Sequence, residues 1–474
     1  MEQIQQFIAG DQAATAAVQA LTQAGGQVYV VGGAVRDAVL DKPVKDVDLM
    51  VTGLTDSQIE SALSPVGKLN FTGKDFGVYR LRVGDDEVEI ALPRTEQSTG
   101  SGHKDFDVTA DPYLDPSVDL YRRDFTGNAM AYNATTGELL DPHGGQEDLQ
   151  NGDLKLVNPQ AFEDDPLRIV RALVANARFG LQPDQNLIDS MKQNAQEIRH
   201  LPGERIQMEM DKLMSAADPA SAIQIAADTG LLDYLAPELS STIGFDQMNP
   251  HHDLDVFSHT MQVLRAMTRL SNDPDMRLAA LFHDSGKPDS FWHDETAPDG
   301  GGGHFYKKKL DDGSFIGQDH DEVGADLVNA FMERLRYPNN RRERVVTLVR
   351  NHMFPYFSST KGARKFLANL GNDPKMAFDL LTLREADASG KTDNTPNDFD
   401  RESIDKCYAA LQQILDNNEP TSVRDLALGG RDLMALGLVG PEIGQMQKKL
   451  LADILEDPSL NTPETLTQLV NEYR

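Results

Sequence analysis

Two aspartates spaced two residues apart follow a glycine pair and an arginine in GGAVRDAVLDKPVKDVDLMV, residues 32–51. On a β-strand, Asp46 and Asp48 would point their carboxylates to the same face. Two like charges held side by side repel each other unless a divalent cation neutralises them. Oxygen-only ligands suit Mg²⁺, which characteristically binds one or two carboxylates together with substrate phosphates. We therefore predict that Asp46 and Asp48 are catalytic and bind Mg²⁺.

The residues before this pair are suited to phosphate binding. Gly32 and Gly33 end a predicted buried strand, where a missing Cβ lets backbone amides approach a phosphate closely. Arg36, in the short helix predicted next, would add a cation to the same phosphates. An isolated Asp-x-Asp favours an ordinary Asp-rich turn. With the glycines and the arginine, the segment instead favours a site for a nucleoside triphosphate and its metal, used for nucleotidyl transfer.

The segment GGAVRD…KDVD resembles the signature of the class II tRNA nucleotidyltransferase and bacterial poly(A) polymerase family, a branch of the polymerase β-like nucleotidyltransferases. Four later stretches resemble further motifs of this family, although Gly127 and Asp164 stand where the family has isoleucine and glutamate. The resemblance implies that Arg123 and Asp124 hold the sugar and triphosphate of the incoming nucleotide. Glu89 is either a third metal-site carboxylate or an exposed strand residue. The four stretches are LYRRDFTGNAMAY (120–132), DPHGGQEDL (141–149), FEDDPLRIVRA (162–172) and ERIQMEM (204–210).

A second prediction concerns the choice of nucleotide. Asp165 and Arg168 are spaced i, i+3 at the start of a predicted helix, so they share a face. A carboxylate only accepts hydrogen bonds and a guanidinium only donates them, which matches the amino group and ring nitrogen of cytosine and adenine. The spacing alone favours a helix cap with a surface ion pair. With the family resemblance, we predict that this pair selects CTP and ATP, and the resemblance adds Arg171 to the nucleotide-binding residues.

Eight of the eleven histidines lie between residues 251 and 352. Four of these histidines, with two aspartates between residues 284 and 387, are predicted to point into a helical core. An unpaired polar side chain in such a core lowers the free energy of unfolding by several kcal/mol. Such a set favours a metal site, and its nitrogen-rich ligands suit Ni²⁺, Mn²⁺, Co²⁺ or Zn²⁺ better than Mg²⁺. The order H…HD…H…H…D resembles the HD phosphohydrolase superfamily, including the HD domain that some bacterial tRNA nucleotidyltransferases carry. The resemblance implies metal-dependent hydrolysis of phosphoesters such as 2′,3′-cyclic nucleotides. The predicted ligands are His259, His283, Asp284, His320, His352 and Asp387.

The elements that must position these groups change character along the chain. Up to about residue 155 the pattern is mixed α/β, with a helix over 7–26, a second strand over 45–53 and a hairpin that turns at Gly84. Beyond it almost every periodic segment is helical, apart from a Gly- and Asp-rich stretch over 285–315 that is predicted to be a long loop. The predicted fold is an α/β polymerase β-like head followed by an all-α neck, an HD domain and a C-terminal helical bundle. The predicted domains are the nucleotidyltransferase head (1–155), the helical neck (156–245), the HD domain (246–395) and the helical tail (396–474).

Bulk properties limit the remaining choices. The 474 residues suffice for about three domains, and 39% hydrophobic with 25% charged residues is typical of a soluble globular protein. No apolar run approaches the roughly 20 residues that span a bilayer, no secretory pattern is present, and Cys407 is the only cysteine. We expect a cytoplasmic monomer or homodimer that does not bind membranes. The net charge of −30 lowers the expectation of a polyanionic partner without excluding one.

The sequence therefore predicts an enzyme that adds C and A to tRNA 3′ ends from CTP and ATP, with Mg²⁺ in the head and a second, metal-dependent phosphohydrolase site. A CC-adding, A-adding or poly(A)-polymerase relative is the alternative within the same class. An RNA-end-binding protein with one degenerate site is the alternative from another class.

Overall fold

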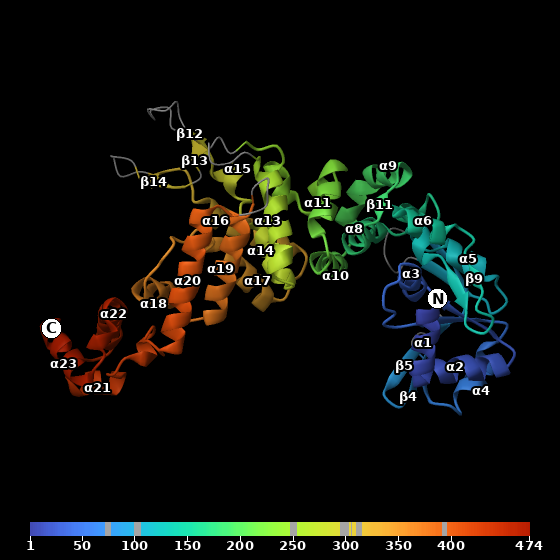
Figure 1. The fold of residues 1–474 in the computed structure, drawn as a ribbon, viewed down its shortest axis with the longest axis horizontal. Helices are drawn as coiled ribbons and strands as arrows, with labels where there is room; N and C mark the ends of the chain where they lie inside the picture. Colours follow the sequence, from blue (N-terminus) through green and yellow to red (C-terminus); the bar gives the residue numbers. More distant parts are fainter. Residues whose placement is uncertain are drawn as a thin grey trace. The chain divides into compact units, whose positions relative to one another are not determined.

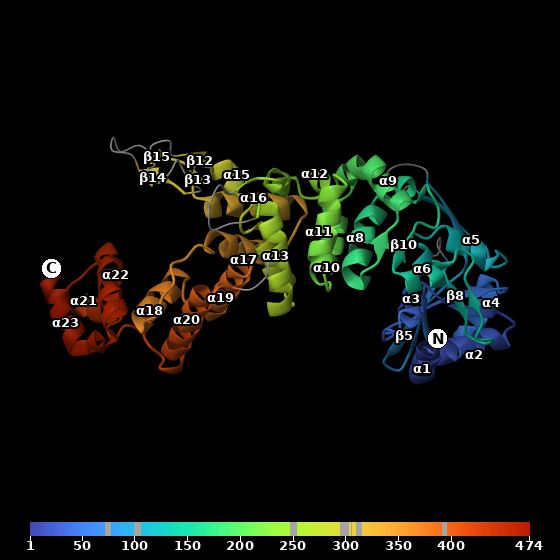
Figure 2. The ribbon, with the colours of Figure 1, turned by 45° about the horizontal axis from the view of Figure 1, so that its top comes forward.

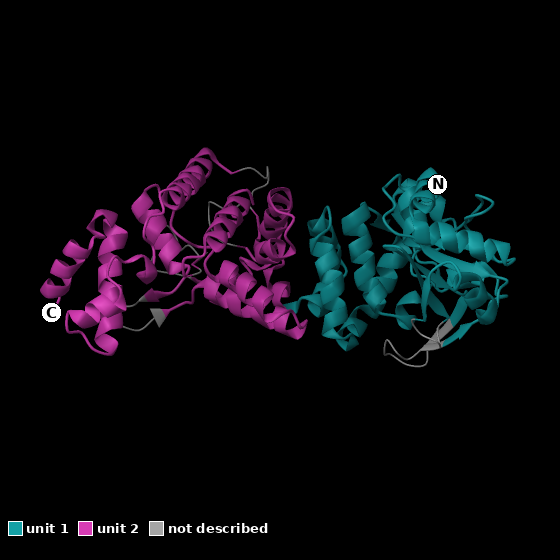
Figure 3. Ribbon diagram, turned by 90° about the horizontal axis from the view of Figure 1, so that it is seen from below, with its two compact units in different colours: residues 1–237 teal, residues 238–474 magenta. Residues whose placement is uncertain are grey.

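The computed structural model describes residues 1–71, 77–98, 106–246, 254–293, 303–304, 306–309, 315–390 and 396–474. The chain forms two compact units, Met1–Pro237 and Glu238–Arg474, which we describe separately (Figure 3). The finer division into four domains stays a prediction, and its boundary at residue 395 lies outside the described residues. Within the described ranges, no helix has both the length and the apolar character needed to cross a membrane.

A seven-stranded mixed sheet forms the centre of the first unit (Figure 1). Its strands are β1 (Gln27–Val31), β2 (Asp48–Thr52), β3 (Lys68–Phe71), β4 (Val78–Val83), β5 (Asp86–Ala91), β8 (Ala131–Asn133) and β9 (Leu139–Leu140). Their order is β3-β4-β5-β2-β1-β8-β9. β2 is antiparallel to β1 and parallel to β5, with Asp48 opposite both Val31 and Glu89. The end of β1 and the start of β2 therefore lie at the same edge of the sheet.

Short helices and a separate strand pair surround this sheet. They are α1 (Glu2–Gly10), α2 (Gln12–Gln23), α3 (Gly33–Val39), α4 (Asp56–Leu63), α5 (Pro116–Tyr121), η1 (Thr126–Asn128), α6 (Gly145–Asn151) and the pair β6 (Arg94–Ser98) and β7 (Phe106–Ala110). Helix α2 packs against β4, β5 and α4, and α3 packs against β1 and α6.

In the head, the structure corrects the predicted bounds of one helix and one strand and confirms the predicted hairpin. The helix predicted over 7–26 is two helices, because Asp11 leaves helical geometry and its Oδ1 accepts a hydrogen bond from Ala14 N (2.7 Å), which caps α2. The strand predicted over 45–53 begins only at Asp48, so Asp46 precedes it. The hairpin is confirmed as β4 and β5, with Gly84 at φ +63° in the turn.

The rest of the first unit is almost entirely helical. It contains β10 (Asp153–Leu154), α7 (Ala161–Asp164), α8 (Leu167–Phe179), β11 (Gln182–Pro183), α9 (Gln185–Asn194), η2 (Ala195–His200), α10 (Gly203–Met214), α11 (Pro219–Asp228) and α12 (Leu232–Leu235). Helix α8 is the centre of this part, because α10 and α11 both pack against it. It ends at Gly180, whose φ of +73° is the left-handed conformation common after helix C-termini.

The 3-10 helix η3 (Pro237–Thr242) contains the boundary between the two units. The second unit then continues as packed helices (Figure 2). These are α13 (Val256–Leu270), α14 (Pro274–Phe282), α15 (Lys287–Ser290), α16 (His320–Arg334), α17 (Asn339–Arg350), α18 (Thr360–Asn369), α19 (Pro374–Ala388) and α20 (Asp398–Asp416). Helix α14 contacts α13, α16, α17 and α19, so it is central to this group. The fold class predicted from the sequence, an α/β head followed by helical regions and an HD domain, is confirmed.

The described residues of the predicted loop over 285–315 include a short helix and four short strands, which corrects the expectation for them. Its described residues form α15 and two short antiparallel pairs, β12 (Trp292–His293) with β13 (Gly303–His304) and β14 (Lys308–Lys309) with β15 (Phe315–Ile316). The remainder, 294–302, 305 and 310–314, lies outside the described residues.

A small helical group closes the chain. It consists of η4 (Val423–Asp425), α21 (Gly430–Ala435), α22 (Pro441–Glu456), η5 (Pro458–Leu460) and α23 (Pro463–Glu472). Its apolar core includes Leu433, Leu450 and Leu466, all fully buried. The predicted terminal bundle thus has a hydrophobic core of its own.

Candidate active sites

The two aspartates predicted to bind Mg²⁺ lie at the start of β2. Both are exposed, and the strand register places Glu89 directly opposite Asp48. Partial removal from water, followed by the charges of Glu89 and Asp46, raises the pKa of Asp48, whereas Arg123 opposes the shift. Glu89 itself is held by Arg80, with Nη2 3.4 Å from Oε2. A carboxylate whose pKa is raised by other carboxylates is stabilised by a cation, so this all-oxygen donor set fits a divalent ion such as Mg²⁺.

The turn between β1 and α3 brings a guanidinium beside these acids. Gly32 has φ +72°, and a Cβ there would lie 2.8 Å from Nη1 of Arg123, so only glycine suits this position. Nη2 of Arg123 lies 3.4 Å from Asp119, while its buried Nε makes no hydrogen bond within the described part of the chain. Burial lowers the pKa of the Arg123 guanidinium. A cation with a donor to spare is suited to binding an anion. Gly33 follows as the first residue of α3.

A chain of polar contacts joins the remaining nucleotide-binding residues predicted in the head to α8. Arg36 donates to Asn128 Oδ1 (2.9 Å), and Asn128 donates to Asp124 Oδ1 (2.9 Å). The other carboxylate oxygen of Asp124 lies 2.7 Å from Nη2 of Arg171 in α8. Arg36 also pairs with Asp37 at 2.6 Å. The structure therefore brings Arg36, Asp124 and Arg171 into one network.

Asp165 and Arg168, the predicted base-recognition pair, make separate contacts. Asp165 precedes α8, and its carboxylate lies 3.1 Å from Nη2 of Arg205 in α10. Arg168 is buried and donates to the main-chain oxygens of Arg122 (2.8 Å) and Ala161 (3.3 Å). No hydrogen bond or ion pair joins the two side chains, both of which the structure describes. Base recognition by this pair therefore stays a prediction, with Arg205 as a neighbour of the carboxylate.

The six predicted metal ligands come together in the second unit, from five helices. All four histidines and Asp284 are buried. His259 lies in α13, His283 and Asp284 follow α14, His320 begins α16, His352 follows α17 and Asp387 lies in α19. The structure thus gathers residues that are more than a hundred positions apart in the sequence.

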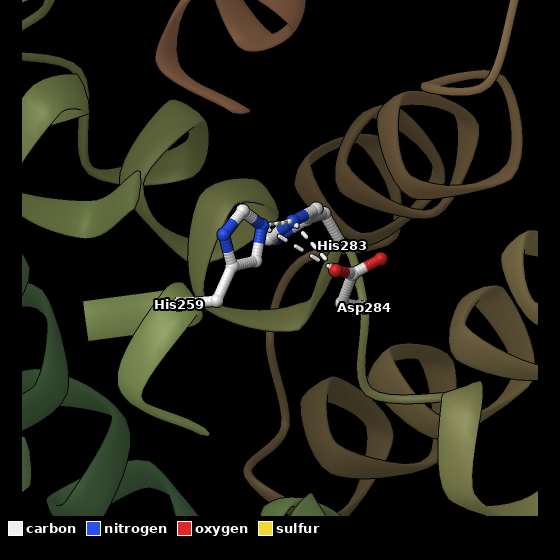
Figure 4. A group of neighbouring side chains, drawn as sticks. All are labelled: His259, His283 and Asp284. Atoms are coloured by element: carbon white, nitrogen blue, oxygen red, sulfur yellow. Dashed lines mark hydrogen bonds and ion pairs between the residues drawn. The ribbon is translucent and has the colours of Figure 1, made fainter. Parts of the chain in front are cut away.

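Three of these histidines have the same orientation. Each places Nδ1 within 2.8 Å of a main-chain oxygen, which only accepts, so Nδ1 carries a proton and Nε2 is the nitrogen left to bind a cation. The Nε2 atoms of His259 and His283 are 3.3 Å apart and face each other (Figure 4). Two Nε2 atoms that face each other are stabilised by a cation between them, as in metal sites whose histidines are fixed through the other ring nitrogen. The pairs are His259 with Gly390, His283 with Ala280 and His352 with Val349.

Asp284 divides the ligands into two groups. Its Oδ2 lies 3.5 Å from Nε2 of His259 and 3.3 Å from Nε2 of His283. Its Oδ1 lies 3.5 Å from Nε2 of His320 and 3.8 Å from Nε2 of His352. Each oxygen therefore faces a pair of imidazoles, and each group of three ligand atoms lies within 4.8 Å.

The charges around these ligands favour a cation. Burial opposes protonation of His283, yet Asp284 and Asp387 outweigh it and raise the pKa of His283 to about 10. Burial acts to raise the pKa of both aspartates, but the neighbouring imidazoles hold each well below its usual range. Lys287 pairs with Asp284 (2.6 Å) and Arg384 with Asp387 (3.0 Å). Ionised carboxylates that draw a proton onto a buried imidazole, with nitrogen donors around them, fit a transition-metal ion.

Four residues of these networks were not singled out from the sequence. Asn128 and Arg205 lie inside the stretches RRDFTGNAM and ERIQMEM, so the motifs contained the signal without indicating the contacts. Lys287 belongs to HDSGK, and Arg384 stands three residues before Asp387. An i, i+3 spacing from a predicted ligand could have identified both.

Comparisons with known proteins agree with this division of the chain. Residues 28–155 match the family model described as the poly A polymerase head domain. Residues 180–243 match one described as a probable RNA and SrmB-binding site of polymerase A, and residues 256–388 match the HD domain.

Similarity to known proteins extends over most of the chain. A multifunctional CCA protein of Nitrosococcus oceani is 35% identical over 77% of this chain and 85% of its own length. A protein of the same name from Xanthomonas campestris pv. campestris is 32% identical over 88% of this chain and 95% of its own length. Among solved structures, the Bacillus stearothermophilus CCA-adding enzyme in complex with CTP has a similar fold, with a TM-score of 0.66 at 20% identity, over 98% of this chain and 97% of that one. The Thermotoga maritima CCA-adding enzyme complexed with tRNA has a TM-score of 0.56 at 19% identity, over 96% and 93% of the two chains.

Together, the site geometry and these similarities identify an enzyme with a nucleotidyltransferase head and an HD phosphohydrolase domain, both dependent on divalent metal ions. The chain belongs to the multifunctional CCA protein family.

Proposed function

We propose that this chain adds C and A nucleotides to the 3′ ends of tRNA from CTP and ATP. The observation that carries the proposal is the cluster of Asp46, Asp48, Gly32 and Arg123 at one edge of the sheet. It combines paired carboxylates for a metal with a glycine turn and a buried guanidinium for phosphates. The names of the related CCA proteins, and of solved structures with CTP, ATP and tRNA, support these substrates. A tRNA substrate also supports a cytoplasmic location.

The head residues would have distinct roles in the transfer. Asp46 and Asp48 would hold Mg²⁺, which supplies positive charge to the attacking and departing oxygens when bound. Gly32 leaves room for the triphosphate beside the backbone, and Arg123 donates to it. Asp124, oriented by Asn128 and Arg171, accepts from the sugar hydroxyls of the nucleotide.

Selection of C and A would depend on the start of α8. The carboxylate of Asp165 accepts from the amino group that cytosine and adenine share and that uracil lacks. In the structure Asp165 is oriented by Arg205, while Arg168 is held against the main chain of residues 122 and 161. For Arg168 to donate to the base, its guanidinium must exchange at least one of these main-chain acceptors for the nucleotide.

We further propose that the HD domain hydrolyses 2′,3′-cyclic phosphodiesters with the help of two transition-metal ions. His259, His283 and Asp284 would hold one ion, and Asp284, His320 and His352 would hold the other. This number follows from the two ligand groups, which share only Asp284. Ions bound there, among Ni²⁺, Mn²⁺, Co²⁺ and Zn²⁺, would supply the positive charge that phosphoester hydrolysis requires. Water adds across one P–O bond, and its proton passes to the departing ribose oxygen. Lys287 and Arg384 keep the two aspartates ionised and oriented for this role.

One experiment tests the proposed nucleotidyl transfer. The protein is incubated with Mg²⁺ and a tRNA that ends at the discriminator base, with CTP, ATP, both, or each other nucleotide. The tRNA 3′ ends are then sequenced. We expect CC with CTP alone and CCA with both. Addition of CC only, of A only or of A-tails would identify a CC-adding, A-adding or poly(A)-polymerase relative, and no addition would overturn the proposal.

Metal analysis tests the second site. The protein is loaded with Mn²⁺ or Ni²⁺, dialysed and analysed for bound metal, with His259→Ala and His352→Ala variants beside it. We expect two ions per chain in the wild type and fewer in each variant. A single ion that either substitution removes completely would contradict the proposal of two ions.

A further inference from the structure

A group of aromatic side chains and one lysine comes from the part of the sequence between the metal ligands Asp284 and His320. We call Trp292, His304, Tyr306 and Lys308 the aromatic cluster. The ring centroids of Trp292 and His304 are 4.6 Å apart, and those of His304 and Tyr306 are 5.2 Å apart. Nζ of Lys308 lies 5.4 Å from the centroid of Trp292. The side chain of Tyr306 is half exposed, whereas His304 and Trp292 are partly covered.

The fold of the segment keeps this cluster together. Trp292 pairs with His304 in β12 and β13, and its Nε1 donates to the main-chain oxygen of Tyr306 (2.8 Å). Gly317 has φ +73°, and a Cβ there would lie 2.3 Å from Cδ1 of Trp292, so the indole packs directly on the backbone. Trp292 therefore holds the cluster together through its contacts, and Tyr306 and Lys308 are its exposed members.

The cluster is attached to the rest of the second unit at both ends, and its second end lies next to an HD metal ligand. Before it, the ring of Phe291 packs against Phe245 at 5.6 Å. After it, the backbone N–H of Lys307 donates to Asp319 Oδ1 (2.9 Å), and Asp319 directly precedes the ligand His320. Standard chain dimensions then limit Lys307 N to roughly 11 Å from the Cα of His320. Figures 1 and 2 both show β12 and β13 beside α15.

We propose that the aromatic cluster binds the base and a flanking phosphate of the nucleotide whose phosphoester is cleaved at the HD site. An exposed aromatic ring offers a stacking surface for any base, and lysine pairs with phosphate. Three consecutive lysines, residues 307–309, follow Tyr306 and form a short run of positive charge within a segment that is otherwise rich in aspartate. The proposal rests on the proposed hydrolase function, since it assigns that site the nucleotide class of phosphoester. A free nucleotide and the end of a single-stranded RNA offer the same chemistry.

The simplest alternative is that these rings only fasten the two strand pairs to each other. In that case Trp292 would matter for stability, but the exposed members would not affect ligand binding. The pair of variants Tyr306→Ala and Lys308→Gln separates the two ideas, because both side chains are exposed and neither is buried against the core.

Trp292 provides a direct reporter of binding, because it is the only tryptophan of the chain. We would titrate the metal-loaded protein with 3′-AMP, with a short RNA ending in a 3′-phosphate, and with the baseless methyl riboside 3′-phosphate, following tryptophan fluorescence. We expect quenching by both base-containing ligands, with the Kd of each raised roughly tenfold by Tyr306→Ala. Lys308→Gln should raise the Kd of the RNA roughly tenfold, because only the RNA carries a flanking phosphate, and should leave that of 3′-AMP unchanged. Equal responses to baseless and base-containing ligands, or an unchanged Kd in both variants, would overturn the proposal. Tighter binding of the RNA than of 3′-AMP would identify an RNA end as the preferred source.

Kinetics then separate this proposal from the hydrolase proposal. With 2′,3′-cyclic AMP, which has no flanking phosphate, Tyr306→Ala should raise KM roughly tenfold at unchanged kcat, whereas Lys308→Gln should leave both constants unchanged. With the baseless methyl riboside 2′,3′-cyclic phosphate, neither variant should change KM or kcat. The control variants Tyr113→Ala and Lys448→Gln remove exposed side chains elsewhere and should leave both substrates unaffected. If the wild type cleaves neither substrate, the hydrolase proposal fails, while the fluorescence titration still decides whether the cluster binds nucleotides.

Discussion

At the scale of single residues, repulsion between the carboxylates of the head lowers the stability of the metal-free fold and favours binding of a metal ion. Because partial removal from water and the charges of Glu89 and Asp46 raise the pKa of Asp48, its ionised form is disfavoured in the metal-free fold. We expect Asp48→Asn to lower nucleotide addition by at least about a hundredfold, since it removes a metal ligand. The same change should leave Tm equal or higher without Mg²⁺, because it relieves repulsion.

Primer extension on tRNA and thermal unfolding without metal would check this pair of effects. Asp85→Asn is the matched control, because Asp85 is exposed in the β4–β5 turn, and it should change neither quantity. Near-normal addition by Asp48→Asn in Mg²⁺ would remove Asp48 from the catalytic site.

A second residue-scale prediction concerns Arg205, which the structure pairs with Asp165. Loss of Arg205 frees the carboxylate that we propose to recognise the base amino group. We expect Arg205→Ala to lower kcat/KM for CTP and ATP roughly tenfold or more and to narrow their advantage over UTP, in the same direction as Asp165→Ala. Steady-state kinetics with each nucleotide measure this. Lys212→Ala, which removes an exposed cation of the same helix, is the control, and an unchanged preference in Arg205→Ala would contradict the orienting role.

At the scale of elements, the start of α14 shows how a helix that ends at the metal ligands is held. Asp273 Oδ1 accepts from Asp275 N (3.0 Å), and Oδ2 lies 2.8 Å from Nη1 of Arg344 in α17. Burial acts to raise the pKa of Asp273, but these contacts outweigh it and the pKa is lowered. A lowered carboxyl pKa stabilises the fold fully above the ordinary value near 3.8 and progressively less as pH falls through the folded value.

We therefore expect Asp273→Ala to lower the unfolding free energy of the second unit by about 1 kcal/mol at neutral pH, the usual cost of losing a helix cap. The difference from the wild type should shrink as pH falls below about 4. Calorimetry over this pH range measures both. Asp11→Ala removes a cap in the other unit and should leave the second transition unchanged. A constant difference down to pH 3 would mean that the Asp273 charge contributes nothing.

Elements also show what the sequence could and could not reveal. Helical periodicity correctly predicted that His259 and His320 are buried, because burial follows a 3.6-residue period. His352 is buried too, but it lies beyond the end of α17, and Asp387 in α19 is only partly buried. Periodicity could not show that the two oxygens of Asp284 face different histidine pairs, since that depends on how five helices pack.

The same limit applies to the head and to the 285–315 segment. The pairing of Asp48 with Glu89 requires the non-local order of β2 and β5, which no local pattern contains. The strand pairs in residues 292–316 are two residues long, too short for an alternating pattern, so composition alone predicted a loop there.

At the scale of the whole molecule, the two candidate sites differ in position and in chemistry. The carboxylates of the head belong to the first unit, and the histidine-rich ligands belong to the second. All-oxygen and nitrogen-rich donor sets prefer different metals. The two activities should therefore be separable, unless the histidine-rich set acts as a structural clasp whose binding free energy stabilises the whole chain.

The double variant His320→Ala/His352→Ala decides between these two possibilities. It removes two ligands but leaves the buried Asp284–Lys287 pair intact, which avoids the penalty of an unpaired buried charge. We expect loss of Mn²⁺- or Ni²⁺-stimulated cleavage of 2′,3′-cyclic AMP, with CTP and ATP incorporation into tRNA within about twofold of the wild type. His200→Ala, which removes an exposed histidine of the first unit, is the control for both assays. If the double variant instead had a lower Tm and lost nucleotide addition as well as hydrolase activity, the histidine-rich set would be a structural clasp. A metal ion that acts only in catalysis within the second unit would not be needed for nucleotide addition in the first.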